Sequence, residues 1–268
     1  MTEDIEYRGL VAEAWDLLRG DYSNWPDRPF YRAIIERQGG RALDVGCGTG
    51  RLLLDYLAAG LDVDGVDNSP DMLAICRQKA AALDLDLAGR LFQQSMDGLD
   101  LPGRYGTILV PSSSFQLLTD VDSANAALRC FRRHLAPQGV LVMSIMSKLW
   151  PGKTPPEHMQ WSDWRKIGER QRPEDGVTVR RWIRARYDHE QQLEHEENRY
   201  ELVDEAGNVL RAEEHRRSPA VRWYTQAQIV DAVARAGFAD VRLTSGFTEA
   251  NADEADTTFC VIGRRPAV

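Results

Sequence analysis

The chain has 268 residues and a mass of 30.2 kDa, which fits one large α/β domain or one domain with a sizeable insertion. Asp and Glu number 41 against 33 Lys and Arg, so the formal net charge is −8 at pH 7. An acidic chain has no broad positive field, so neither nucleic acid nor an anionic membrane is an expected partner.

Targeting signals and cysteine spacing restrict the class further. The N-terminal sequence MTEDIEYRGL lacks the apolar stretch of a signal peptide, and no apolar run approaches the ~18 residues of a membrane span. The four cysteines show neither CxxC nor metal-ligand spacing. We therefore expect a cytoplasmic protein with reduced thiols and no metal site.

Hydrophobic periodicity predicts helices over 5–20 and 29–38, and residues 1–40 are interpreted as an N-terminal helical cap. Strands and helices then alternate, which predicts βαβ units and a parallel sheet. The expected strands are 42–45, 62–66, 91–93, 107–110 and 140–145, and the expected helices are 50–59, 70–82 and 122–134.

Residues 150–222 differ in pattern, because they are dense in charge of both signs and alternate over 177–187, 193–203 and 209–217. This pattern predicts a small antiparallel sheet with one solvated face. The α/β pattern resumes with a helix over 225–236 and strands over 239–245 and 257–263. The core is thus expected in two pieces, 41–149 and 223–268.

The first expected strand runs into a glycine-rich turn with the pattern D-x-G-x-G-x-G, formed by Asp44, Gly46, Cys47, Gly48 and Gly50. Such a turn lets backbone N–H groups approach a ligand closely. A plain tight turn between strand and helix would use the same residues. The context favours a nucleoside site, because a carboxylate at the end of the second strand can accept hydrogen bonds from ribose hydroxyls, and Asp67 stands there.

The dinucleotide fingerprint G-x-G-x-x-G is not met. Counted from Gly46, the third glycine position holds Arg51, and counted from Gly48 it holds Leu53. This departure argues against NAD as the nucleoside.

At these motifs the chain resembles the class I S-adenosylmethionine-dependent methyltransferases. The segments that resemble the family are ALDVGCGTGRLLL, DVDGVDNSPDML, FRRHLAPQGVLVMSIM, and GFADVRL with TTFCVIGRR. The resemblance implies a Rossmann-like, mostly parallel seven-stranded sheet of order 3-2-1-4-5-7-6, with strand 7 antiparallel and the charged β segment inserted as a lid after strand 5. It implies S-adenosyl-L-methionine as the cofactor and S-adenosyl-L-homocysteine as its product.

The resemblance also implies roles for particular residues. The glycine-rich turn would surround the methionine part and ribose, Asp67 would hold the ribose hydroxyls, and Asn68 and Met72 would flank the adenine. Relatives commonly carry an acidic residue after the third strand, where this chain has Ser95. Ser95, the backbone of Met96, or Asp97 would therefore contact the adenine, and Pro111 follows the fourth strand at the cavity.

The motif after the fourth strand, VPSSSFQ, lacks the N/D-P-P-aromatic signature of enzymes that methylate adenine or amide nitrogens. Together with the N-terminal segment it is more similar to small-molecule methyltransferases, such as amino-sugar N,N-dimethyltransferases and glycine N-methyltransferase. An amine nitrogen is the favoured acceptor, since a hydroxyl needs a general base or a metal.

The inserted segment 150–222 is interpreted as a lid that binds the acceptor, with a dimerisation arm as the alternative, so the protein is expected as a monomer or a homodimer. His215 is the candidate base. The candidate acceptor-binding residues are Tyr22, Trp25, Ser113, Phe115, Trp182 and Tyr224.

Two other functions stay open at this point. One is a nucleotide-dependent oxidoreductase, which the failed dinucleotide fingerprint disfavours. The other is a non-catalytic protein that binds S-adenosylmethionine without transferring its methyl group.

Overall fold

The computed structural model describes residues 7–147 and 154–267, and within them it contains two sheets. The larger sheet has seven strands in the order β10-β11-β5-β4-β1-β2-β3. Their bounds are β1 Ala42–Val45, β2 Val63–Asp67, β3 Leu91–Gln93, β4 Tyr105–Val110, β5 Leu135–Met146, β10 Ala239–Ser245 and β11 Thr258–Arg264.

The strand order confirms the predicted fold class. Strands β1 to β5 pair in parallel, whereas β11 lies antiparallel between β5 and β10. Because β10 and β11 are the sixth and seventh strands of this sheet along the chain, the order reads 3-2-1-4-5-7-6.

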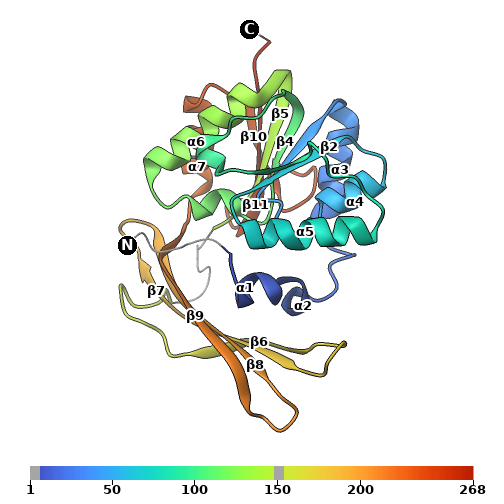
Figure 1. Ribbon diagram of the computed structural model, residues 1–268. Coiled ribbons are helices and arrows are strands. Elements are labelled where there is room, and N and C mark those ends of the chain that lie inside the picture. The colour runs from blue at the N-terminus through green and yellow to red at the C-terminus, as the bar shows by residue number, and fades with distance from the viewer. Residues whose placement is uncertain (1–6, 148–153, 268) are drawn as a thin grey trace.

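Helices cover both faces of the seven-stranded sheet (Figure 1). On one face lie α6 and α7, and on the other lie α3, α4 and α5. Their bounds are α3 Asp27–Gln38, α4 Leu53–Ala58, α5 Pro70–Ala82, α6 Val121–His134 and α7 Gln226–Arg235, with short 3-10 helices η1 Met96–Gly98 and η2 Ser114–Leu117. The Ser69 hydroxyl caps α5 by accepting the Met72 N–H, with Pro70 at the first helical position, as the sequence predicted.

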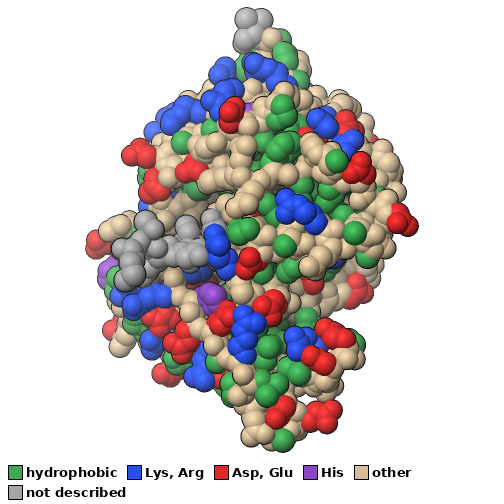
Figure 2. Space-filling model, in the orientation of Figure 1, with side chains coloured by type: hydrophobic (Ala, Val, Ile, Leu, Met, Phe, Trp, Pro, Cys, Tyr) green, Lys and Arg blue, Asp and Glu red, His purple; other side chains and the backbone are tan. Residues whose placement is uncertain are grey.

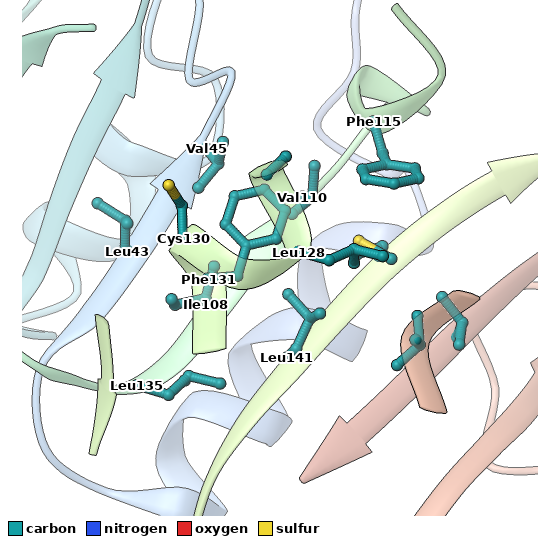
Figure 3. Close-up of a cluster of buried hydrophobic side chains, with 14 of the residues drawn as sticks. Leu43, Val45, Ile108, Val110, Phe115, Leu128, Cys130, Phe131, Leu135 and Leu141 are labelled. Atoms are coloured by element: carbon teal, nitrogen blue, oxygen red, sulfur yellow. The ribbon is translucent and has the colours of Figure 1, made fainter. Parts of the chain in front are cut away.

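Apolar side chains from α6 and the central strands form the larger part of the core (Figure 3). Phe131 and Leu128 project from α6 onto Ile108 and Leu141 of β4 and β5, and all four are fully buried or nearly so. Strands buried on both faces have near-continuous apolar sequences, which is why β4 and β5 were recognisable.

The second sheet has the order β6-β7-β8-β9 and is antiparallel throughout. Its strands are β6 Arg165–Gln171, β7 Thr178–Asp188, β8 Leu193–Val203 and β9 Val209–Arg222. The sequence predicted the last three of these. It did not predict β6, an edge strand whose side chains are all exposed or half-buried, so no apolar alternation marks it.

The N-terminal segment differs from the single helix expected over 5–20, of which residues 5 and 6 lie outside the described residues. The structure has two short helices, α1 (Leu10–Glu13) and α2 (Trp15–Arg19). Helix α1 begins at Leu10 because its N–H donates to the Glu213 carboxylate of β9 at 2.8 Å and Gly9 turns the chain with φ 54°. Helices α1 and α2 lie between the second sheet and the helices that cover the seven-stranded sheet (Figure 1).

Charged side chains of both signs are interspersed on the part of the surface that the second sheet forms (Figure 2). Ion pairs across its strands, such as Arg180 with Glu169 at 2.7 Å, account for the charge density of this segment. Among the described helices, none is long and apolar enough to cross a membrane.

Replacing Phe131 with alanine should lower the free energy of unfolding by about 3–5 kcal/mol, because a fully buried ring leaves a cavity. The matched control is Val121→Ala on the same helix, where the side chain is 58% exposed and the expected loss is below about 0.5 kcal/mol. Urea denaturation measures both. Equal losses would contradict the placement of α6 on the sheet.

Candidate functional site

A cavity of about 300 Å³ opens at the carboxyl ends of β1, β2 and β4, where parallel α/β sheets bind ligands. We call it the first cavity. Gly46 and Gly48 of the glycine-rich turn line it with φ values of 73° and 55°. An added Cβ at Gly46 would approach Ser114 Oγ to 2.8 Å, whereas at Gly48 it would meet no protein atom within 4 Å. Gly48 therefore presents bare backbone to open space.

Asp67 ends β2 and lines the first cavity beside this turn. Its Oδ2 accepts the Gly48 N–H at 2.9 Å and its Oδ1 accepts the Ser69 N–H at 2.9 Å. These two bonds fix the carboxylate at the mouth of the glycine-rich turn, where a ribose would lie against it.

Asp44 also lines this cavity and is almost fully buried, since only 1% of the residue is exposed. Burial raises the pKa of Asp44 to about 7, although Arg51 acts to lower it. Its Oδ1 is buried with no hydrogen-bond partner. A buried carboxylate oxygen in this position is ready to accept from a cationic ligand group.

The N-terminal segment supplies a wall of the first cavity, formed by Tyr7, Trp15 and Arg19, none of which was among the predicted site residues. The Arg19 guanidinium lies 4.1 Å from the centroid of the Trp15 ring. Burial and the neighbouring Arg51 lower the pKa of Arg19. No carboxylate of the described residues forms an ion pair with Arg19, so this cation faces the cavity without an anion.

The segment is held in place by contacts with the core. Asp16 accepts hydrogen bonds from Thr49 Oγ1 and from Lys79 Nζ, both at 2.8 Å. The Gly9 N–H donates to Asp71 Oδ2 at 2.8 Å. These polar contacts bring Trp15 and Arg19 over the glycine-rich turn.

The first cavity is also lined by the residues to which the resemblance assigned the adenine, together with Pro111: Asn68, Met72, Ser95, Met96 and Asp97. The Ser95 hydroxyl donates to the Asp97 carboxylate, so the two candidates for the missing acidic residue act as one unit. Which of their atoms meets an adenine stays a prediction.

Cys47 also lines the first cavity, but Gly50 does not. An added Cβ at Gly50 would lie 2.7 Å from Cys76 Sγ and 2.8 Å from Leu54 Cγ. Gly50 is therefore needed for close packing of the turn against α4 and α5, and the structure does not place it against a ligand.

A second cavity of about 230 Å³ adjoins the first one, between the carboxyl edge of the seven-stranded sheet and one face of the second sheet. The residues common to both cavities are Tyr7, Trp15, Ser112, Leu117 and Arg217. Ser112 and Ser113 have φ values of 54° and 59°, an uncommon conformation for residues other than glycine. The turn after β4 thereby places both serines at the junction.

Among the predicted acceptor-binding residues, Ser113 lines the second cavity. Trp182 does not, because on β7 it lies one residue from the cavity-lining Arg181 and so on the other face of the sheet. Tyr22 and Trp25 contact each other, with Lys79 Nζ 3.3 Å from the Tyr22 hydroxyl, and neither lines this cavity or the first.

Phe115 and Tyr224 also lie away from both cavities. Phe115 is fully buried, and its ring packs against Tyr224 at 5.8 Å between centroids. Both residues pack beside α6 and α7 and line a separate cavity of about 580 Å³, so their role in acceptor binding stays a prediction.

His215 lies in the second cavity, with its Nε2 3.1 Å from Glu213 Oε2. Burial acts to raise the pKa of Glu213, but hydrogen bonds from the Leu10 N–H and Arg211 hold this pKa below its usual value. An ionised carboxylate only accepts hydrogen bonds, so Nε2 carries the proton and Nδ1 is the basic nitrogen. In the described chain, no cluster of three or more His, Cys, Asp or Glu side chains could hold a metal.

Comparisons with known proteins show which domain the chain resembles. Residues 42–139 match the family model described as a methyltransferase domain. The chain is 30% identical over 145 residues to a dTDP-3-amino-3,6-dideoxy-alpha-D-glucopyranose N,N-dimethyltransferase of Streptomyces fradiae, and 28% identical over 144 residues to a glycine/sarcosine N-methyltransferase of Halorhodospira halochloris. Each match covers 52% of this chain, and the matches cover 54% and 52% of the two relatives, so the chain spans about half the length of the curated relatives it matches.

Solved structures agree in fold. The CcbJ methyltransferase of Streptomyces caelestis superposes with a TM-score of 0.74 at 20% identity, covering 99% of each chain. DesVI of Streptomyces venezuelae superposes with a TM-score of 0.68 at 23% identity, covering 97% of this chain and 100% of its own. The predicted resemblance is confirmed: residues 42–139 match a methyltransferase domain, and the similar curated proteins include amino-sugar and glycine N-methyltransferases.

Replacing Gly48 with alanine should weaken S-adenosylhomocysteine binding at least about tenfold, because the methyl group enters the space that the ligand needs. Gly40→Ala is the matched control: Gly40 also has a positive φ and open space around it, but is exposed and remote from the cavity. Calorimetric titration compares the two variants. Equal weakening would show that backbone strain, rather than the cavity, causes the loss.

Proposed function

We propose that the protein transfers a methyl group from S-adenosyl-L-methionine to the amine nitrogen of a small-molecule acceptor. The observation that carries the proposal is the junction of two cavities at Ser112, one lined by the glycine-rich turn with Asp67 and the other by polar side chains of the second sheet.

The charged groups of the first cavity fit the cofactor's methionine end, which carries one ammonium and one carboxylate. The unpartnered Asp44 Oδ1 would accept from the ammonium, and the Arg19 guanidinium would bind the carboxylate. Asp67 would accept hydrogen bonds from the ribose hydroxyls. Each charged group of the cofactor's amino acid part would thus meet a side chain of opposite charge.

Bound S-adenosylmethionine would supply an electrophilic methyl group, which the acceptor takes by in-line attack on the methyl carbon with the sulfonium sulfur as the leaving group. Residues at the junction hold the acceptor against that methyl group, and positioning of this kind can supply about 7–11 kcal/mol of rate enhancement. The acceptor nitrogen would attack as a neutral amine, so that its bond to the methyl carbon forms while the sulfur–carbon bond breaks and S-adenosyl-L-homocysteine leaves. An acceptor bound as an ammonium would first give one proton to Nδ1 of His215, with Glu213 holding the opposite side of the imidazole.

We propose that the second sheet acts as the acceptor-binding lid. Gln116, 1% exposed, ties it to the core, since its Nε2 donates to the Met146 carbonyl at 3.0 Å and to the Arg222 carbonyl at 2.9 Å. The end of β9 is thereby fixed to the end of β5. Cavity-lining residues of β7, β8 and β9 then face the methyl donor.

Binding of S-adenosylhomocysteine should depend on pH through Asp44. Burial raises the pKa of Asp44 to about 7, and a bound ammonium would stabilise the ionised form, so affinity should be full above pH 7 and fall by up to about tenfold per unit below it. Calorimetry from pH 5.5 to 8 measures this dependence. Asp44→Asn should bind weakly at pH 8 and lose the dependence, and an unchanged pH profile in that variant would exclude Asp44 as its source.

The activity is tested by measuring S-adenosylhomocysteine release with a panel of small amines and hydroxyl compounds. At least one amine should be methylated, and His215→Gln should lower kcat about 10²-fold or more while cofactor affinity stays within about twofold. His189→Gln, in the same lid but lining neither cavity, is the control. Cofactor binding without turnover of any acceptor would instead indicate a non-catalytic binding protein.

A further inference from the structure

Among the described residues, two charged side chains that face the second cavity form no ion pair. They are Arg181 on β7 and Glu196 on β8. On the other face of the same sheet, by contrast, Arg180 and Arg184 pair with Glu169 and Glu197 at 2.7 and 2.5 Å.

A single amide holds both charges. The Nε and Nη2 of Arg181 donate to Asn198 Oδ1 at 3.1 and 2.8 Å, and Asn198 Nδ2 donates to Glu196 Oε2 at 3.3 Å. Asn198 is 4% exposed, so the amide is fixed by its surroundings. The cation and the anion are therefore oriented side by side but held apart by the amide group, which prevents them from neutralising each other.

Neighbouring groups complete this arrangement without removing either charge. The Arg181 guanidinium lies 5.5 Å from the centroid of the Tyr200 ring. Arg217 lies in the same cavity, and its Nη1 donates to the Tyr7 hydroxyl at 3.0 Å. Burial acts to lower the pKa of Arg217, but interactions with Tyr7 and Glu196 help to raise it above its usual value. Glu196 thus acts on Arg217 electrostatically, and no ion pair within the described residues joins them.

Half-buried charges that form no close ion pair are costly, which makes the arrangement a poor packing solution and a good binding site. We propose that the acceptor carries an anionic group a few bonds from its amine: Arg181 binds the anion and Glu196 binds the amine in its ammonium form. The inference rests on the proposed function and specifies its substrate class. A carboxylate and a phosphate monoester both satisfy Arg181, since a guanidinium binds either through two parallel hydrogen bonds.

Three matched sets of acceptors test the inference, with S-adenosylhomocysteine release as the readout. They are short amino acids, aminoalkyl phosphates of the same length, and uncharged analogues in which a primary amide or hydroxyl replaces the anion. Acceptors of one anionic set should show kcat/KM at least about tenfold above the uncharged analogues, and the two anionic sets distinguish carboxylate from phosphate. Equal turnover of uncharged analogues would overturn the inference and leave the proposed function intact, whereas no turnover of any amine would overturn both.

The Arg181→Gln variant tests whether Arg181 causes the selectivity for anionic acceptors. It should lower the ratio of kcat/KM for anionic over uncharged acceptors by about tenfold or more, mainly through KM. Arg180→Gln is the control, because it removes the same charge from the adjacent residue, which faces away from the cavity. Unchanged S-adenosylhomocysteine affinity shows that both variants are folded. A ratio that falls equally in both variants, or in neither, would refute the role of Arg181.

Discussion

The hydrogen bond from the Gly48 N–H to Asp67 Oδ2 joins the turn after β1 to the end of β2. Parallel strands place both elements at one edge of the sheet, and this bond sets the distance between a bare backbone surface and a carboxylate. A ligand that fits there needs hydroxyl groups for the carboxylate and a chain narrow enough for the glycine-rich turn. The ribose and methionine portions of S-adenosylmethionine meet both requirements.

The remaining walls come from segments far apart in the sequence. Glu213 of β9 accepts the N–H of Leu10 and also lies against His215, so one carboxylate links the N-terminal helices to the candidate base. Asp16 connects the same helices to Thr49 and Lys79 of the core. The first and second cavities are therefore assembled by a shared set of polar contacts.

The sequence was sufficient for the sheet order and the first cavity because both depend on local patterns: apolar strands, a glycine-rich turn and a carboxylate at a strand end. It was insufficient where tertiary contacts decide. Nothing local indicated that Arg19 would reach the cavity, since contacts of Asp16 with distant residues place it there. On β7, a shift of one residue separates the cavity-facing Arg181 from Trp182, and composition does not reveal which face is inward. His195 alternates with charged residues along β8, yet it is only 8% exposed, and its Nδ1 lies 2.7 Å from Ser218 Oγ.

The cavity beside the glycine-rich turn is expected to take up a sulfonium nucleoside rather than a dinucleotide. Isothermal titration of the folded protein with S-adenosylmethionine, its demethylated product and NADH distinguishes the two ligand classes. We expect saturable one-to-one binding of the first two compounds and no heat of binding with NADH. Saturable binding of NADH, together with no uptake of either sulfur compound, would show that the cavity is a dinucleotide site.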